Sequence, residues 1–396
     1  MPDISVGSQI FDLLFHPSHP TIYTGLLTGQ VKAFQYDEQG QHQPTFAVRP
    51  SKRSCRCLTI SEDGSQLWAG GKAKAIYTID TTTGTVSETR KNAHESPINR
   101  MKHLMPHMFS TGDDDGVVKL WDPRKPDDIR GYTHHFDFIS DFLWLEDKKQ
   151  LVTTSGDGTL SVIDVRGKKS EPFAQSEDQE DELLSIVSIK SGSKVVVGTQ
   201  TGILSIFNRS HGWGDCVDRV PGHPQSIDAL CTLPSSYPSS HSTILTGSSD
   251  GLLRAVQLFP TKLLGVVADH GSFPIERIAV DLGGEGRWVG SAGHEDTLKM
   301  TDLKDVFEDE EGEADEGANA QVDVASDEDD LAGDDQTPVG LNKIPAVIEA
   351  SDDEEAQDSD VQKEKKRKRK GDKNLAGKRK KGRNEIDAEP SFFTGL

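Results

Sequence analysis

A hairpin-like stretch recurs seven times in the first 304 residues of this chain. Its clearest copy is Met108 to Asp122, MFSTGDDDGVVKLWD, in which two apolar runs flank an acidic, glycine-containing turn. Two short apolar runs with a tight turn between them predict a β-hairpin. The second run, VVKLW, is apolar on both of its faces except at Lys119. A strand of this kind lies between two layers, so the hairpin cannot be buried without further copies.

The other copies align on the residue at which the hairpin ends. The intervals between successive ends are 45, 42, 42, 44, 49 and 45 residues. A period of about 40–45 residues built only from strands and turns is typical of four-stranded propeller blades. We therefore predict an all-β fold, with a seven-bladed β-propeller over residues 1–304. The seven hairpin ends are Gln35, Asp80, Asp122, Asp164, Asn208, Gln257 and Asp302.

These repeats resemble the WD-repeat family, and Trp121-Asp122 is the one literal WD dipeptide. The resemblance implies a WD40 β-propeller. It also implies that blade three contains the buried histidine–hydroxyl–aspartate–tryptophan network of the family, with members His94, Thr111, Asp115 and Trp121. These residue types suit the role, because a buried indole N–H and a buried imidazole each require a partner. The alternative, a catalytic His94 and Asp115, is less favoured since the repeat already explains both residues.

Blade seven lacks an outer strand in the sequence. The chain turns acidic directly after Leu303, whereas earlier blades have an outer strand such as Thr85–Thr89. Closing the ring of blades would remove exposed strand edges. We therefore predict that Ile4–Val6, or a segment near it, completes blade seven.

Beyond the propeller the charge separates into two blocks. Residues 305–361 carry 22 acidic side chains and one basic side chain, and residues 362–396 carry 13 basic and five acidic ones. Of the net charge of −21, residues 1–304 contribute −8. Blocks with so much charge and so few aromatic residues bury too little surface to offset the entropy of ordering. We predict a disordered acidic segment over 305–361 and a basic tail over 362–396.

The tail contains three kinds of motif. Ser326 and Ser351 precede acidic runs and resemble casein-kinase-2-type phosphorylation sites, with unmodified serines as the alternative. Val339–Ile348 is an apolar island that could dock on a partner or simply be a less charged linker. Two basic clusters resemble a bipartite nuclear-localisation signal, and such arms also contact phosphates. Their residues are Lys365, Lys366, Arg367, Lys368, Arg369, Lys370, Lys378, Arg379, Lys380 and Lys381.

The combination of a degenerate propeller, an acidic block, a basic cluster and the terminal Phe392-Phe393-Thr-Gly-Leu396 sharpens the resemblance. It is similar to the nucleolar WD-repeat family of vertebrate WD repeat-containing protein 55 and its fungal Jip-type counterparts. The resemblance implies a scaffold in ribosome biogenesis, acting in ribosomal RNA processing or pre-ribosome assembly. It further implies a nuclear and nucleolar location, partner proteins in pre-ribosomal particles, an import receptor, and RNA contact through the basic tail. The propeller itself is expected to be monomeric.

The sequence gives no indication of an enzyme or of a cofactor. It contains no GxxxxGK[ST] and no HExxH, so neither a phosphate loop nor a zinc-protease motif is present. The four cysteines, Cys55, Cys57, Cys216 and Cys231, have no zinc-site spacing and suggest neither a metal site nor disulfides. The N-terminal residues lack a signal-peptide pattern, and no apolar run is long enough for a membrane span.

Two other binding functions remain open. Trp121-Asp-Pro-Arg124 fits the WDxR ending of the box by which substrate receptors contact the adaptor of cullin-4 ubiquitin ligases, and Ile163-Asp-Val-Arg166 is a partial second copy. The acidic tail could instead shield basic histone surfaces, as in a histone chaperone. If the propeller binds partners with a rim, arginine and tryptophan are the expected contact types. The candidates are Arg53, Arg56, Arg100, Trp144, Arg254 and Arg277.

Overall fold

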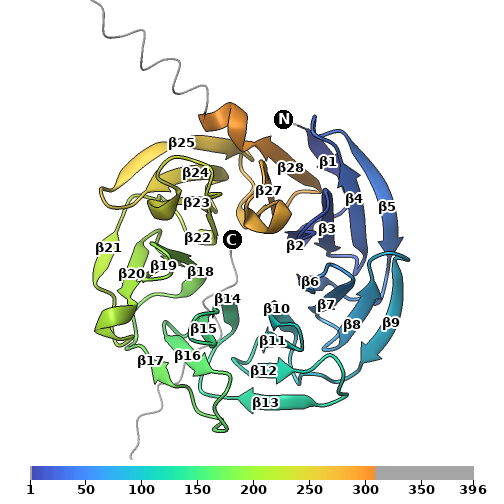
Figure 1. Ribbon diagram of the computed structural model, residues 1–396, viewed down its shortest axis with the longest axis horizontal. Helices are drawn as coiled ribbons and strands as arrows, with labels where there is room; N and C mark the ends of the chain where they lie inside the picture. The colour runs from blue at the N-terminus through green and yellow to red at the C-terminus, as the bar shows by residue number, and fades with distance from the viewer. Residues whose placement is uncertain (1, 308–396) are drawn as a thin grey trace, which may run out of the picture. The chain divides into compact units, whose positions relative to one another are not determined.

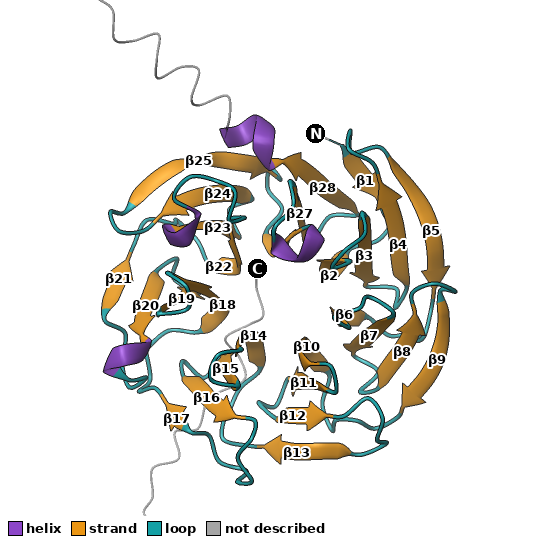
Figure 2. Ribbon diagram, viewed as in Figure 1, coloured by secondary structure: helices purple, strands orange, loops and turns teal. Residues whose placement is uncertain are grey.

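The computed structural model describes residues 2–307. Seven four-stranded antiparallel sheets stand around a central axis, and in six of them the strands follow chain order from the axis outward (Figure 1). Helical structure in this part of the chain is confined to short segments (Figure 2). They are the 3-10 turns η1 (Arg209–His211), η2 (Ser240–Ser242) and η3 (Leu282–Gly284), and a helical turn at 303–307. The predicted seven-bladed propeller is therefore confirmed.

The first four blades come from uninterrupted stretches of chain. Blade one contains β2 (Ile10–Phe15), β3 (Thr21–Leu26), β4 (Val31–Tyr36) and β5 (His42–Val48). Blade two contains β6 (Cys55–Ile60), β7 (Gln66–Gly71), β8 (Ile76–Asp80) and β9 (Thr85–Arg90). Blade three contains β10 (Ile98–Met105), β11 (Met108–Asp113), β12 (Val118–Trp121) and β13 (Asp128–Tyr132). Blade four contains β14 (Ile139–Leu145), β15 (Gln150–Ser155), β16 (Leu160–Asp164) and β17 (Ala174–Gln175).

Blades five and six follow the same plan, and blade seven departs from it. Blade five contains β18 (Leu183–Ile189), β19 (Lys194–Thr199), β20 (Leu204–Asn208) and β21 (Asp218–Val220). Blade six contains β22 (Ile227–Thr232), β23 (Thr243–Ser248), β24 (Leu252–Gln257) and β25 (Lys262–Asp269). Blade seven contains β26 (Ile275–Val280), β27 (Trp288–Gly293) and β28 (Thr297–Asp302), with the N-terminal β1 (Asp3–Ser5) outermost.

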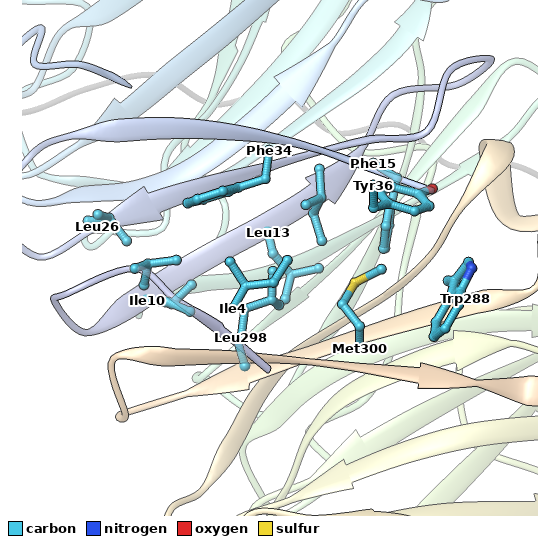
Figure 3. Close-up of a cluster of buried hydrophobic side chains, with 13 residues drawn as sticks. Ile4, Ile10, Leu13, Phe15, Leu26, Phe34, Tyr36, Trp288, Leu298 and Met300 are labelled. Atoms are coloured by element: carbon cyan, nitrogen blue, oxygen red, sulfur yellow. The ribbon is translucent and has the colours of Figure 1, made fainter. Parts of the chain in front are cut away.

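The N-terminal strand closes the ring, as predicted from the missing outer strand of blade seven. β1 pairs antiparallel with β28, with Ile4 opposite Leu298. Ile4 and Val6 are fully buried at the seam between blades seven and one, in a cluster drawn from both ends of the propeller (Figure 3). Across the same seam, the Tyr36 hydroxyl donates to Asp281 Oδ2 over 2.9 Å. The seam is therefore packed as an interior rather than left as an edge.

The burial pattern explains why the repeats read as apolar on both faces. The second strands of the blades, such as β19, are buried at nearly every position, because each lies between two neighbouring blades. Outer strands such as β9 are exposed along most of their length. Each hairpin has two apolar faces, and the neighbouring blade on each side buries one of them.

The last described residues are anchored on the long loop between β22 and β23 of blade six. Phe307 lies against Tyr237, with ring centroids 5.4 Å apart, and Val306 belongs to the same apolar cluster. Residues 305–307, which the sequence assigned to the acidic tail, thus form part of a helical turn that packs on the propeller. The remaining tail predictions, including both phosphorylation sites and both basic clusters, lie outside the described residues.

Candidate functional site

The two ends of the ring are different surfaces. Each inner strand starts at one end, which also holds the turns between the second and third strands and the loops that lead from one blade to the next. We call this end the first face and the opposite end the second face. The inner strands β2, β6, β10, β14, β18, β22 and β26 line a channel between the two faces.

The mouth of the channel on the first face is a ring of seven side chains, one from each blade. In every inner strand the pairing register shifts at the second residue, so this residue is bulged out of the ladder. A bulge re-aims its side chain and frees it from the sheet. All seven bulged residues line one cavity of about 360 Å³. They are Phe11, Arg56, Asn99, Ser140, Leu184, Asp228 and Glu276.

Hydrogen bonds fix the part of the mouth that lies over blades two and three. Arg56 donates to Asn99 Oδ1 over 2.8 Å and to Asp114 Oδ1 over 3.0 Å, and Asn99 Nδ2 donates to Asp114 over 2.6 Å. Arg56 was one of the candidate rim arginines, and its guanidinium lies at this mouth with its charge already matched by Asp114. This part of the mouth is therefore polar and pre-organised.

The opposite part of the mouth combines carboxylates with apolar side chains. Asp228 accepts hydrogen bonds from the Ser226 and Ser249 hydroxyls, and burial raises the pKa of its carboxyl. Glu276 contacts His294 Nε2 at 2.7 Å and remains partly exposed. Leu184 and the ring of Phe11 line the same cavity. A side chain with an apolar stem and a cationic end suits this lining, because both of its parts find a partner.

Deeper in the channel, four charged residues link blades that are far apart in sequence. Asp12 Oδ1 lies 3.4 Å from Arg277 Nε and 3.9 Å from Arg100 Nη1, and Arg100 Nε lies 3.4 Å from Asp141. Burial raises the pKa of Asp12, and the two arginines oppose that shift. Arg100 and Arg277 were proposed for the rim. The structure places Arg100 inside the channel, whereas Arg277 lies in the channel and also lines the mouth cavity; carboxylates hold the charges of both.

Each of the two carboxylates of this deeper group also ties its own blade to the next. Asp12 Oδ2 accepts the backbone N–H of Leu58 in blade two over 2.7 Å. Asp141 Oδ2 accepts the backbone N–H of Ile186 in blade five over 3.2 Å. These groups are therefore parts of the scaffold, and the half-buried ring of side chains at the mouth is the surface that a ligand can reach.

The buried network of blade three has the predicted histidine, threonine and tryptophan but a different aspartate. His94 Nδ1 lies 2.7 Å from Asp113 Oδ2, and its Nε2 lies 2.6 Å from Thr111 Oγ1, which also accepts the Trp121 indole N–H over 2.8 Å. Asp115 was the wrong choice. It is exposed and accepts a hydrogen bond from Ser96, because the turn after β11 directs Asp113 inward and Asp115 outward.

Comparison with known proteins agrees with this architecture, since residues 1–306 match the WDR55 family. The chain belongs to the WDR55 family. The WD repeat-containing protein JIP5 of Laccaria bicolor is 60% identical over 419 residues that cover both chains completely. The protein of the same name from Coprinopsis cinerea is 63% identical over 318 residues, which cover 80% of this chain and 77% of that one. WD repeat-containing protein 55 of Rattus norvegicus is 33% identical over 312 residues, 78% of each chain.

In this WDR55-family chain, three further blades have a partial version of the network that was not predicted from the sequence. Each places a histidine Nε2 about 2.8 Å from a hydroxyl of its own blade: His135 to Ser161, His223 to Thr246 and His270 to Ser291. The sequence shows a histidine in the loop before the inner strand of each of these blades. It does not show which hydroxyl the histidine contacts, because that hydroxyl comes from the third strand in blade four and from the second strand in blades six and seven.

The WDxR arginines lie on the second face. Arg124 and Arg166 each form a bidentate ion pair with the aspartate two residues earlier, Asp122 and Asp164. Their Nε and Nη2 atoms donate to the carboxylate oxygens over 2.7–2.9 Å. Hydrogen bonds from Arg124 hold the pKa of Asp122 well below its usual range. Both arginine side chains are 63% exposed. They are thus oriented by a neighbouring carboxylate and accessible to a partner.

The other rim candidates differ in their environment. Arg53 is exposed on the first face. Arg254 is largely buried and forms an ion pair with Asp250 at 2.5 Å, and Trp144 is half-buried with Lys149 over its ring. Within residues 2–307 there is no cluster of histidine, cysteine or acidic side chains that could hold a metal ion. No helix in this part of the chain is long and apolar enough to span a membrane.

Proposed function

We propose that this WDR55-family protein is a non-enzymatic scaffold in nucleolar ribosome biogenesis, where it assists ribosomal RNA processing or pre-ribosome assembly. The observation that carries the proposal is the channel mouth: seven bulged side chains, one from each blade, line a single cavity on a rigid ring. Loops and bulges on a rigid frame are where binding functions concentrate. The ribosomal role rests on the resemblance to the nucleolar WD-repeat family and on the two basic clusters.

The ligand that the mouth favours is a protein segment with a lysine or arginine side chain. Asp228 and Glu276 provide the negative charge, and Phe11 and Leu184 provide apolar surface for the aliphatic stem. Charge-assisted hydrogen bonds of this kind are stronger than neutral ones. The partners would then be basic proteins of pre-ribosomal particles.

Co-sedimentation with pre-ribosomal particles tests the proposal. The full chain should travel with the particles, and the double variant Asp228→Asn/Glu276→Gln should travel with them several-fold less. The matched control, Glu38→Gln/Asp127→Asn, removes two exposed carboxylates from the second face and should behave as wild type. Wild-type protein that stays at the top of the gradient under every salt condition would refute the particle association.

Imaging a fluorescent fusion tests the proposed location. We expect nuclear and nucleolar signal that disperses when residues 363–383 are removed, because the basic clusters would engage an import receptor and phosphates. A full-length fusion found only in the cytoplasm would contradict a nucleolar role.

A cullin-4 substrate receptor is the second candidate, and the exposure and fixed orientation of Arg124 and Arg166 favour it. Arg124→Ala with Arg166→Ala should abolish capture of the ligase adaptor if this reading is right, and leave particle association intact if the scaffold reading is right. The histone-chaperone alternative depends on the acidic tail. It predicts that removing residues 308–361 eliminates histone binding.

A further inference from the structure

The first face carries two sectors of opposite charge, one over blades one to three and the other over blades four and five. We call residues 49–54, 71–75 and 91–96 the basic sector; they follow one another around blades one to three. Its six cationic side chains are all exposed, and its one acidic side chain is Glu95. On the same face, the turn of blade three borders the sector with Asp114, which pairs with Arg56, and with Asp115, which accepts a hydrogen bond from Ser96. The cations are Arg49, Lys52, Arg53, Lys72, Lys74 and Lys91.

The segments of the basic sector touch one another, so their charges form one surface. The Lys72 backbone N–H donates to Ser54 O over 3.1 Å, and the Ala93 N–H donates to Lys74 O over 2.9 Å. At the edge over blade one, Arg49 Nε donates to Thr28 O over 2.9 Å. A Cβ added to Gly29 would lie 2.3 Å from Arg53 O, which shows how closely the turn of blade one approaches this loop.

The acidic sector occupies the corresponding turns and loops of blades four and five. It comprises residues 156–159, 176–182 and 199–203, with six acidic side chains and no basic one. Its segments are joined in the same way, because Gln179 N–H donates to Gly158 O and Gln200 N–H donates to Glu182 O. Its acidic residues are Asp157, Glu177, Asp178, Glu180, Asp181 and Glu182.

The cations of the basic sector are not neutralised within the described chain. None of the ion pairs of residues 2–307 includes any of the six, whereas Arg56, next to this sector at the channel mouth, pairs with Asp114. Six unpaired cations on one contiguous surface repel one another, and a polyanion would relieve that repulsion. The surface therefore fits a ligand that offers several negative charges in a row.

The backbone and pockets of the basic sector favour a nucleic acid over an acidic peptide. The backbone N–H groups of Lys72, Lys74 and Ala93 already donate to carbonyls, so an incoming peptide strand finds little to pair with. A pocket among these loops has a volume of about 10 Å³, too small for a side chain. The basic sector therefore attracts a ligand mainly through its charge. A nucleic-acid strand carries its negative charge on its backbone and can bind through electrostatic attraction alone.

We propose that the basic sector binds the phosphate backbone of a nucleic-acid strand, independently of the channel mouth and of the basic tail. The acidic sector repels the same strand within about 10 Å at 0.1 M salt, so the strand is confined to the half of the face over blades one to three. No base-reading contact is offered, and binding is sequence-tolerant and strongly salt-dependent.

Salt titration of binding to a fluorescent oligouridine strand tests the proposal on the full chain. The sector variant is Lys52→Gln/Arg53→Gln/Lys72→Gln/Lys91→Gln. The matched control, Lys125→Gln/Lys168→Gln/Lys169→Gln/Lys262→Gln, removes four exposed cations from the second face, and both variants keep the tail. All eight positions are exposed, so both variants should melt at the wild-type temperature.

We expect the sector variant to bind about tenfold more weakly, or worse, at 0.1 M salt. The slope of log affinity against log salt should fall by about 0.7 for each phosphate contact removed. The control should stay close to wild type, and single-stranded DNA of the same length should behave like the RNA probe. Equal affinities and slopes for the sector variant and the control would overturn the proposal. So would a sector variant that loses binding to polyglutamate while keeping the oligouridine, since that result assigns the sector to an acidic protein.

Discussion

Blade three and blade seven are held together by different devices. Blade three is one continuous stretch of chain, and its strands are joined by a buried network in which Thr111 serves both His94 and Trp121. Blade seven takes its outer strand from the other end of the propeller, and Ile4 and Val6 seal it with apolar packing. The comparison teaches that a degenerate repeat can lose its side-chain network, provided that its edge is covered by other means.

The largest expected effect concerns blade seven. Deleting residues 1–8 removes two fully buried aliphatic side chains and exposes the edge of β28, so the free energy of unfolding should fall by about 5 kcal/mol or more. Chemical denaturation measures it. Ile4→Ala should cost about 2–5 kcal/mol, and Ser5→Ala, exposed on the same strand, should cost almost nothing. An unchanged melting temperature after the deletion would refute the role of β1 in closing the ring.

The second effect concerns the shared hydroxyl of blade three. Thr111→Val keeps the shape of the side chain but leaves His94 Nε2 and the indole N–H of Trp121 without a partner, at a cost of about 2–4 kcal/mol. Thr153 occupies the matching position of β15, and its hydroxyl is buried without a hydrogen-bond partner among residues 2–307. Thr153→Val should therefore be neutral or stabilising. Equal losses for the two variants would show that packing, and not the network, explains blade three.

A smaller effect separates the two aspartates of the blade-three turn. Asp113→Asn should destabilise the protein by about 1–2 kcal/mol, because this carboxylate accepts from His94 and from the backbone N–H groups of Asp115 and Val117. Asp115→Asn should change the stability by less than about 0.5 kcal/mol, since its side chain is exposed. The opposite ranking in thermal unfolding would restore Asp115 to the network.

The smallest effect is on the pH dependence of stability beside blade three. His134 stacks edge-on against Tyr132 of β13, and burial, together with the neighbouring His135, lowers the pKa of His134 to about 4. The neutral form is favoured on folding, so its contribution is complete above pH 6.5 and declines as the pH falls toward 4. His134→Asn should reduce this slope near pH 5 by up to about 1.4 kcal/mol per pH unit. No change in slope would mean that His134 is equally accessible to protons in the folded and unfolded states.

The fold was predictable because it depends on a pattern that is repeated. Seven hairpin ends at nearly constant intervals require seven equivalent units, and the absence of an outer strand after Leu303 pointed to the N-terminus. Both inferences use only the period of apolar residues and the need to cover strand edges.

The details of the site were not predictable because they depend on local backbone geometry. Asp113 and Asp115 lie in one turn, and the conformation of that turn decides which carboxylate faces His94. The channel mouth depends on a bulge at the second residue of each inner strand, which leaves no signature in the alternation of residue types. Asp12 and Arg277 form an ion pair although they lie near opposite ends of the propeller sequence, so no short motif predicts their contact.

The pairing of β1 with β28 also means that the first strand is synthesised long before its partner. Ile4 emerges from the ribosome long before Leu298, its partner in the sheet. At about 5–20 residues per second, the first strand waits roughly 15–60 s with its apolar side chains uncovered. During that interval, chaperones or neighbouring blades must cover the apolar side chains of the first strand. A bulky tag fused before Asp3 would lie directly at the seam that closes the ring.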